Sequence, residues 1–166
     1  MGRDKALLEW GNVSLLEYMS QLLSTVTGKV QIIGRGEFPD RIPEKGPLGG
    51  ILTALETTDR DRNLFVAVDL PLLTPEFLRT FHDRFASSSK RVLACRVDGR
   101  FPLCLGIRSD LAGDVARRIE AGSLAVQLFV SESDPEILEE AELVRLGIHP
   151  EIFANINTSG DLAKFR

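Results

Sequence analysis

The sequence predicts an α/β fold in which a mostly parallel sheet is covered by helices on both faces. Segments with the apolar pattern of strands alternate with segments of helical periodicity along the whole chain. Residues 64–68 form an unbroken apolar run, which suits a strand buried on both faces. That run ends at Asp69, and the C-terminal ends of such strands mark the edge where open α/β sheets place their ligands.

Helices are predicted wherever a capping signal precedes a helical stripe of apolar residues. Ser14 and Glu17 have the spacing of a capping box, and Thr74-Pro75 supplies an N-cap followed by a proline at the first helical position. Ser109 is the expected cap of an amphipathic helix that ends near Gly122. The predicted helices cover residues 14–25, 47–58, 76–86 and 109–122, a short stretch after Gly122, and a final segment from Thr158.

The remaining apolar runs predict strands. Asp98-Gly99-Arg100 has the composition of a hairpin turn between two of them. The predicted strands are a short run at 6–10, then 29–34, 64–68, 91–97, 101–107 and 143–147. With no repeats or linkers, the 166 residues are expected to form one domain, residues 1–166.

Composition excludes several classes of function. The chain is 43% apolar and 27% charged, as in ordinary soluble globular proteins. Its net charge of −4 does not indicate binding to nucleic acid. No apolar run reaches the length of a membrane span. Cys95 and Cys104 lie in apolar runs without a C-x-x-C motif, so neither a zinc site nor a disulfide framework is expected. A reducing cytoplasm is the expected location.

Asp69 is the first candidate site residue. The helix that follows it already has its cap at Thr74, so we favour a ligand or metal role for Asp69 over a capping role. A second observation is that the chain opens without the strand and glycine-rich phosphate loop that usually begin an α/β nucleotide-binding fold. We expect about 10–25 further residues upstream, because a short strand and a turn need that length. Without them, neighbouring strands would keep unpaired backbone groups.

Five short motifs occur together in a recognisable order. They are Met1-Gly-Arg-Asp-Lys5, Asp40, Gly46-Pro-Leu-Gly-Gly50, Asp69-Leu-Pro71 and Asn155-Ile-Asn157-Thr158. With them the chain resembles the molybdenum cofactor guanylyltransferases, the MobA-like nucleotidyltransferases. The resemblance implies a Rossmann-like three-layer sandwich of the nucleotidyltransferase type, from which this chain lacks the first strand and most of the glycine-rich loop.

The resemblance also implies roles for individual residues. Lys5 would meet nucleotide phosphates, Asp40 would accept hydrogen bonds from a guanine base, and Asp69 would bind Mg²⁺. Asn155 and Asn157 would lie near the metal and the attacking substrate. Taken without the resemblance, Lys5 and Asp40 fit solvated surface residues equally well or better, and the asparagines fit a turn before the last helix.

The activity that the resemblance implies is Mg²⁺-dependent transfer of GMP from GTP to molybdopterin, with release of pyrophosphate. Residues 121–125 lack the basic residues that an anionic pterin would favour, and Ile33-Gly34 lacks a nucleotide-contacting asparagine. A CTP-using molybdopterin cytidylyltransferase and a sugar-phosphate nucleotidyltransferase are therefore alternatives. Another is a non-catalytic binding protein. Transient contact with molybdoenzymes or their chaperones is the only protein partnership expected.

Overall fold

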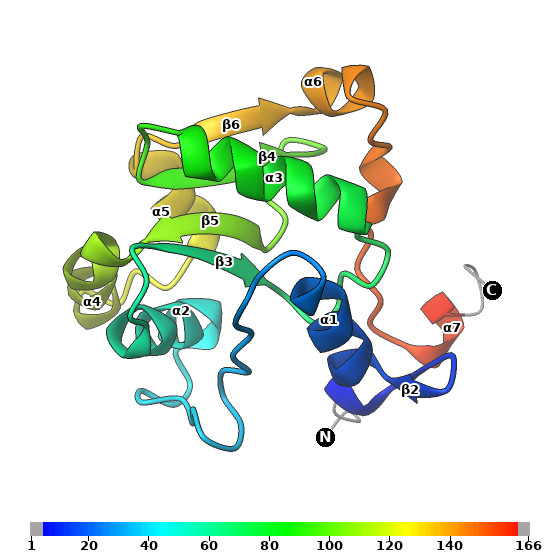
Figure 1. Ribbon diagram of the computed structural model, residues 1–166. Coiled ribbons are helices and arrows are strands. Elements are labelled where there is room, and N and C mark those ends of the chain that lie inside the picture. The colour runs from blue at the N-terminus through cyan, green and yellow to red at the C-terminus, as the bar shows by residue number, and fades with distance from the viewer. Residues whose placement is uncertain (1–4, 163–166) are drawn as a thin grey trace.

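The computed structural model describes residues 5–162, and its centre is a mixed four-stranded sheet. The strands are β3 (Arg62–Val66), β4 (Val92–Arg96), β5 (Cys104–Arg108) and β6 (Glu136–Glu139), in the spatial order β3-β5-β4-β6. β5 runs antiparallel to both of its neighbours, and β6 runs parallel to β4. β3, β4 and β6 therefore share one direction, and β5 alone is reversed because it returns from β4 as a hairpin (Figure 1).

Helices cover both faces of this sheet, as the sequence predicts (Figure 1). They are α1 (Leu15–Ser24), α2 (Gly46–Thr57), α3 (Pro75–Ser87), α4 (Ala112–Glu120), α5 (Val126–Glu132), α6 (Glu140–Arg145) and α7 (Ser159–Leu162). A small hairpin, β1 (Glu9–Trp10) and β2 (Val13–Ser14), precedes α1, and 3-10 turns occupy Lys5–Leu7, Ser109–Leu111 and Pro150–Phe153. None of the helices within residues 5–162 is long and apolar enough to cross a membrane.

Side-chain caps explain where α1 and α3 begin. The Ser14 hydroxyl accepts a hydrogen bond from the amide of Glu17, and the Thr74 hydroxyl accepts one from Phe77, each at 3.2 Å. Both predicted caps are confirmed. Ser109 does not cap α4: it starts a 3-10 turn, and α4 begins after Leu111 without a side-chain cap.

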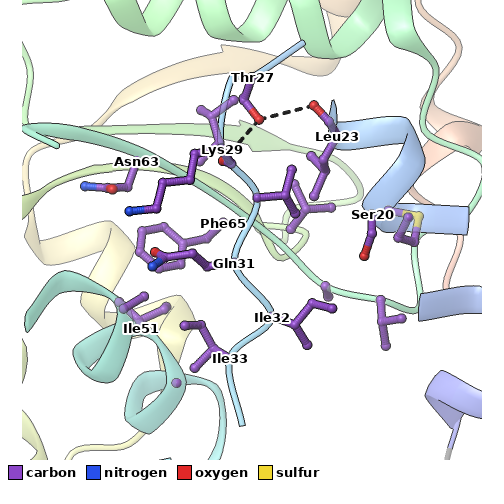
Figure 2. A pocket seen from close by; sticks show the side chains of 18 of the residues that line it. Ser20, Leu23, Thr27, Lys29, Gln31, Ile32, Ile33, Ile51, Asn63 and Phe65 are labelled. Carbon is purple, nitrogen blue, oxygen red and sulfur yellow. Dashed lines mark hydrogen bonds between the residues drawn. The ribbon is translucent and has the colours of Figure 1, made fainter. Parts of the chain in front are cut away.

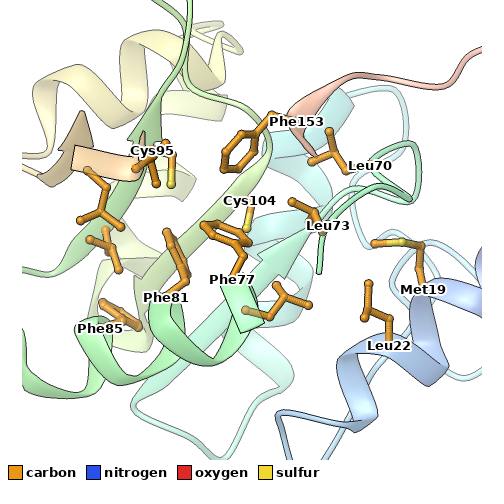
Figure 3. Packing of buried hydrophobic residues seen from close by; sticks show 14 residues of the cluster. Met19, Leu22, Leu70, Leu73, Phe77, Phe81, Phe85, Cys95, Cys104 and Phe153 are labelled. Carbon is orange, nitrogen blue, oxygen red and sulfur yellow. The ribbon is translucent and has the colours of Figure 1, made fainter. Parts of the chain in front are cut away.

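The core has two layers because neighbouring residues of each strand face opposite sides of the sheet. On one side, Phe77, Phe81 and Phe85 of α3 pack over Cys95 and Cys104 (Figure 3). On the other side, α2, α4 and α5 pack against β4 and β5. Burial raises the pKa of Cys104 to about 12 and also raises that of Cys95, so both thiols remain protonated members of the core.

Three strand predictions are wrong in whole or in part. The run at 6–10 begins in the 3-10 turn Lys5–Leu7, and only Glu9–Trp10 is a strand. Residues 29–34 contain no strand, because no neighbouring strand pairs with them among the residues that the structure describes. Residues 143–147 lie in and just after helix α6, where Leu143 is buried while Val144 and Leu146 are exposed. Burial on one side only is the pattern of a short surface helix, which an apolar run alone does not distinguish from a strand.

β3 is also less buried than its sequence predicts. Four of the five residues in each of β4 and β5 are buried, whereas β3 has none. The reason is topological: β3 is an edge strand of the described sheet, and no strand within residues 5–162 pairs with its side opposite β5.

Candidate active site

Asp69 lies just beyond the C-terminal end of β3, as predicted. The amide of Ala67 still donates to the carbonyl oxygen of Leu103 at 2.8 Å, so the chain leaves the sheet immediately before Asp69. The main-chain carbonyl of Asp69 accepts a hydrogen bond of 2.8 Å from the amide of Ile156. This bond places residues 155–157 beside the end of β3.

The same C-terminal segment contacts Lys5. The ammonium group of Lys5 donates a hydrogen bond to the side-chain oxygen of Asn157. Both side chains are exposed, which leaves them accessible to a ligand. Three distant parts of the sequence, around Lys5, Asp69 and Asn157, therefore meet at one edge of the sheet.

Asp69 and Asn155 line a cleft of about 640 Å³ at this edge. Asp98 and Arg100, from the turn between β4 and β5, line it as well. Gln127 of α5 holds this turn in place: its side chain accepts from the amide of Phe101 at 2.8 Å and donates to the carbonyl of Phe101 at 2.7 Å.

Arg100 and Gln127 are cleft residues that sequence reasoning missed. The turn containing Arg100 is visible in the sequence, but its position over the end of β3 is not. Arg100 carries a positive charge of the kind that residues 121–125 lack, and it lines this cleft.

Asp40 lies apart from this cleft, against the backbone of two glycines. A Cβ atom added to Gly34 would come within 3.3 Å of the Asp40 carboxylate, and one added to Gly50 would come within 3.8 Å. The loop is fixed to α2 by a 3.1 Å hydrogen bond from the amide of Arg41 to the hydroxyl of Thr53. The exposed carboxylate of Asp40 therefore stands beside the first turn of α2.

That first turn is the Gly46-Pro-Leu-Gly-Gly50 motif. Gly46 has a φ of +59°, which favours glycine, and α2 begins after Lys45 without a side-chain cap. A Cβ on Gly49 would lie 3.0 Å from the Lys45 Cβ and 3.1 Å from the carbonyl oxygen of Ile42, so close packing requires this glycine. Pro47 borders the 640 Å³ cleft and so connects this turn to the region of Asp69.

The residues present fit a magnesium ion of the substrate-bridging kind. Within residues 5–162 there is no cluster of three or more His, Cys, Asp or Glu side chains that could bind a metal ion. Mg²⁺, however, commonly takes one or two carboxylates and completes its shell with water and substrate phosphates. Asp69 offers one such carboxylate at the wall of a cleft.

A mixed sheet between two helical layers, with this group of polar residues at one edge, defines an α/β sandwich of the nucleotidyltransferase type. The fold is shared with a solved structure described as molybdopterin-guanine dinucleotide biosynthesis protein A from Archaeoglobus fulgidus. The TM-score is 0.71 at 19% identity, and the similarity covers 98% of this chain and 89% of the other.

Residues 1–129 match the family described as the MobA-like NTP transferase domain, and the chain belongs to that family. It is 27% identical to a molybdenum cofactor guanylyltransferase of Syntrophotalea carbinolica, over 100% of this chain and 84% of that protein. It is 36% identical to the molybdenum cofactor guanylyltransferase of Xanthomonas euvesicatoria, over 63% of this chain and 57% of the relative. The predicted family, fold class and enzyme class, a nucleotidyltransferase, are thereby confirmed.

Proposed function

We propose that this protein is a molybdenum cofactor guanylyltransferase, which transfers GMP from GTP to molybdopterin and releases pyrophosphate. The observation that carries the proposal is the meeting of Lys5, Asp69 and residues 155–157 at one edge of the sheet. The names of the relatives support the choice of substrates. We further propose that residues 1–166 act as one domain in the cytoplasm, with transient contact to molybdoenzymes or their chaperones.

The chemistry requires no side-chain nucleophile, because the attacking phosphate of the acceptor is already ionised. The chain's part is positioning and charge stabilisation. Asp69 would hold Mg²⁺, which neutralises phosphate charge when bound. Lys5 would orient the phosphates of the nucleotide, while its contact with Asn157 holds it beside the segment that bonds to Asp69.

Base recognition is assigned to Asp40. A carboxylate accepts two parallel hydrogen bonds from the ring N–H and the amino group of guanine, a pattern that adenine does not offer. Asn155 and Asn157 would contact the acceptor, and Arg100 would attract its negative charge.

The test is a transfer assay with purified protein, molybdopterin, Mg²⁺ and one nucleotide at a time. Mass spectrometry should detect molybdopterin guanine dinucleotide, and pyrophosphate should appear in equal amount. A product formed with CTP but not with GTP would identify a cytidylyltransferase. Transfer only to a sugar phosphate would identify a sugar-phosphate nucleotidyltransferase. Absence of both turnover and Mg²⁺-dependent GTP binding would instead favour the non-catalytic binding protein.

A further inference from the structure

A hollow of about 910 Å³ between β3 and α1 contains polar side chains that already bond within the protein (Figure 2). The Thr27 hydroxyl donates a hydrogen bond to the carbonyl oxygen of Leu23 at 3.2 Å. The side-chain amide of Asn63 donates to the carbonyl oxygen of Arg60 at 3.1 Å. These groups are satisfied without a ligand, so they do not indicate a polar binding site.

The 640 Å³ cleft that contains Asp69 differs, because charged side chains on its wall lack a partner. Asp98 and Arg100 both line this cleft, and neither side chain forms a hydrogen bond or ion pair with another residue in the range 5–162. Lys45 is the only other lysine or arginine in that range whose side chain has no such bond. The turn between β4 and β5 therefore offers one carboxylate and one guanidinium group to a ligand.

This turn is held by bonds that do not involve the Asp98 carboxylate. Two main-chain hydrogen bonds of 2.9 Å close the turn. The amide of Asp98 donates to the carboxylate of Glu140 at 3.3 Å, and Gln127 makes two hydrogen bonds to the backbone of Phe101. Because neighbouring elements fix the backbone, Asp98 and Arg100 keep a defined position relative to each other.

Charge limits what the Asp98 carboxylate can face in this cleft. The cleft wall also contains the carboxylates of Asp69 and Glu151, with Arg100 as a cation. The acceptor of the proposed reaction attacks through a phosphate, and a carboxylate that faced this phosphate would repel it. Arg100 suits the phosphate, whereas Asp98 suits a part of the same molecule that donates hydrogen bonds.

A pterin ring has a part of this kind. Its exocyclic amino group and the adjacent ring N–H are two donors side by side, the same pattern that guanine presents. A carboxylate accepts both in two parallel hydrogen bonds. The hydroxyl groups of a sugar phosphate differ, because each can donate or accept and so does not require a carboxylate.

We propose that Asp98 determines the specificity for the acceptor: it accepts hydrogen bonds from the amino group and ring N–H of a pterin, while Arg100 meets the phosphate of the same molecule. This inference rests on the proposed function, since it takes molybdopterin as the acceptor. It adds the part of the ring that is recognised and the residue that recognises it.

The test measures the dissociation constants of two fluorescent probes. They are 6-hydroxymethylpterin phosphate and 6-hydroxymethyllumazine phosphate, in which an oxo group replaces the amino group. The unmodified protein should bind the pterin at least about tenfold more tightly, because the carboxylate would repel the oxo group of the lumazine. Asp98→Asn should shift the ratio of the two constants at least about tenfold toward the lumazine, since asparagine accepts from the ring N–H and donates to the oxo group.

The chain offers two matched controls. Asparagine tolerates the positive φ of Asp98, 49°, so the turn should persist in Asp98→Asn. Asp134→Asn makes the same change at a φ of 48°, in a side chain that is 86% exposed and pairs with Lys90, and it should alter neither constant. Arg100→Gln should weaken both probes by a similar factor and leave their ratio unchanged, because both carry the phosphate.

A smaller shift of the ratio in Asp98→Asn would overturn the proposal. So would an unmodified protein that binds the two probes equally or binds neither. The ratio does not depend on turnover, so the two proposals fail separately. If Asp98 selects the pterin but no GMP is transferred, the proposed function fails and this inference stands. Transfer to molybdopterin without a preference for the pterin probe would give the reverse result.

Discussion

The amide nitrogen of Ile156 lies 2.8 Å from the main-chain carbonyl oxygen of Asp69, and this hydrogen bond joins the end of the chain to the end of β3. Ile156 is fully buried, so its side chain anchors the segment while the flanking Asn155 and Asn157 remain exposed. This alternation turns both amide side chains to the same side of the segment, where Asn155 lines the cleft with Asp69 and Asn157 accepts a hydrogen bond from Lys5.

Asp69→Asn should lower Mg²⁺-dependent nucleotidyl transfer by about two to three orders of magnitude, because it removes a charge where phosphate charge develops. The circular dichroism spectrum should not change, since Asp69 is at the cleft wall and not in the core. Asp83→Asn is the matched control: its side chain is 80% exposed on α3, away from the cleft. Near-normal turnover of Asp69→Asn at limiting Mg²⁺ would exclude Asp69 as the ligand.

Asp40→Asn should weaken the preference for GTP over ATP by roughly 1–3 kcal/mol, the scale of a mismatched polar contact in a binding site. An asparagine side chain offers one acceptor where the carboxylate offers two. The measurement is the dissociation constant of each nucleotide. An equal loss for both would show that Asp40 acts through the conformation of its loop against Gly34 and Gly50.

Arg100→Gln should raise the KM for molybdopterin about tenfold, which corresponds to about 1.4 kcal/mol, while the dissociation constant for GTP stays constant. The reason is that Arg100 is a cation at the wall of the cleft that contains Asp69 and Asn155. Arg79→Gln, on the outer surface of α3 with a side chain 54% exposed, is the control. If both variants raise the KM equally, the effect comes from the overall charge of the protein.

Glu136→Gln should lower the free energy of unfolding at pH 7 but not at acid pH. Burial alone would raise the pKa of Glu136, but hydrogen bonds from Ser88 and Arg84 and the charges of Arg84 and Lys90 more than offset it and lower the pKa. A lowered pKa stabilises the fold above the ordinary value of 4.5, and this contribution is lost as the pH falls through the folded-state value. Urea unfolding of Glu136→Gln and of the unmodified protein at pH 7 and pH 3 measures this difference in unfolding free energy. The same difference at both pH values would contradict the prediction.

Gly106→Ala should destabilise the protein by about 1–3 kcal/mol through overpacking. A Cβ at this position of β5 would lie 2.7 Å from the Phe85 ring, which is itself buried and cannot retreat. Gly113→Ala in α4 is the control, because the nearest atom there is 3.6 Å away and alanine favours a helix by up to about 1 kcal/mol. In chemical denaturation, the midpoint should fall for Gly106→Ala and rise for Gly113→Ala. A shift of both midpoints in the same direction would refute the packing argument.

Much of the fold was predictable because its signals are local. The caps at Ser14 and Thr74 and the turn at Asp98-Gly99 act within a few residues, and all three occur in the structure as predicted. Asp98 and Gly99 both adopt positive φ, 49° and 70°, as a tight hairpin requires. The motifs that indicated the family are equally local, and the match over residues 1–129 confirms the family.

By itself, then, the sequence determined the order of most elements, the family and the location of Asp69 at the end of a strand. Only the tertiary structure decided that residues 29–33 pair with no strand among residues 5–162, that β3 lies at the edge of the described sheet, and that Arg100 belongs to the cleft. The physical reason is that a strand is completed by hydrogen bonds to a neighbour distant in sequence, whereas a helix bonds within itself. A segment with a strand-like sequence, such as residues 29–34, can form a strand, but it does so only where a neighbouring strand bonds to its backbone.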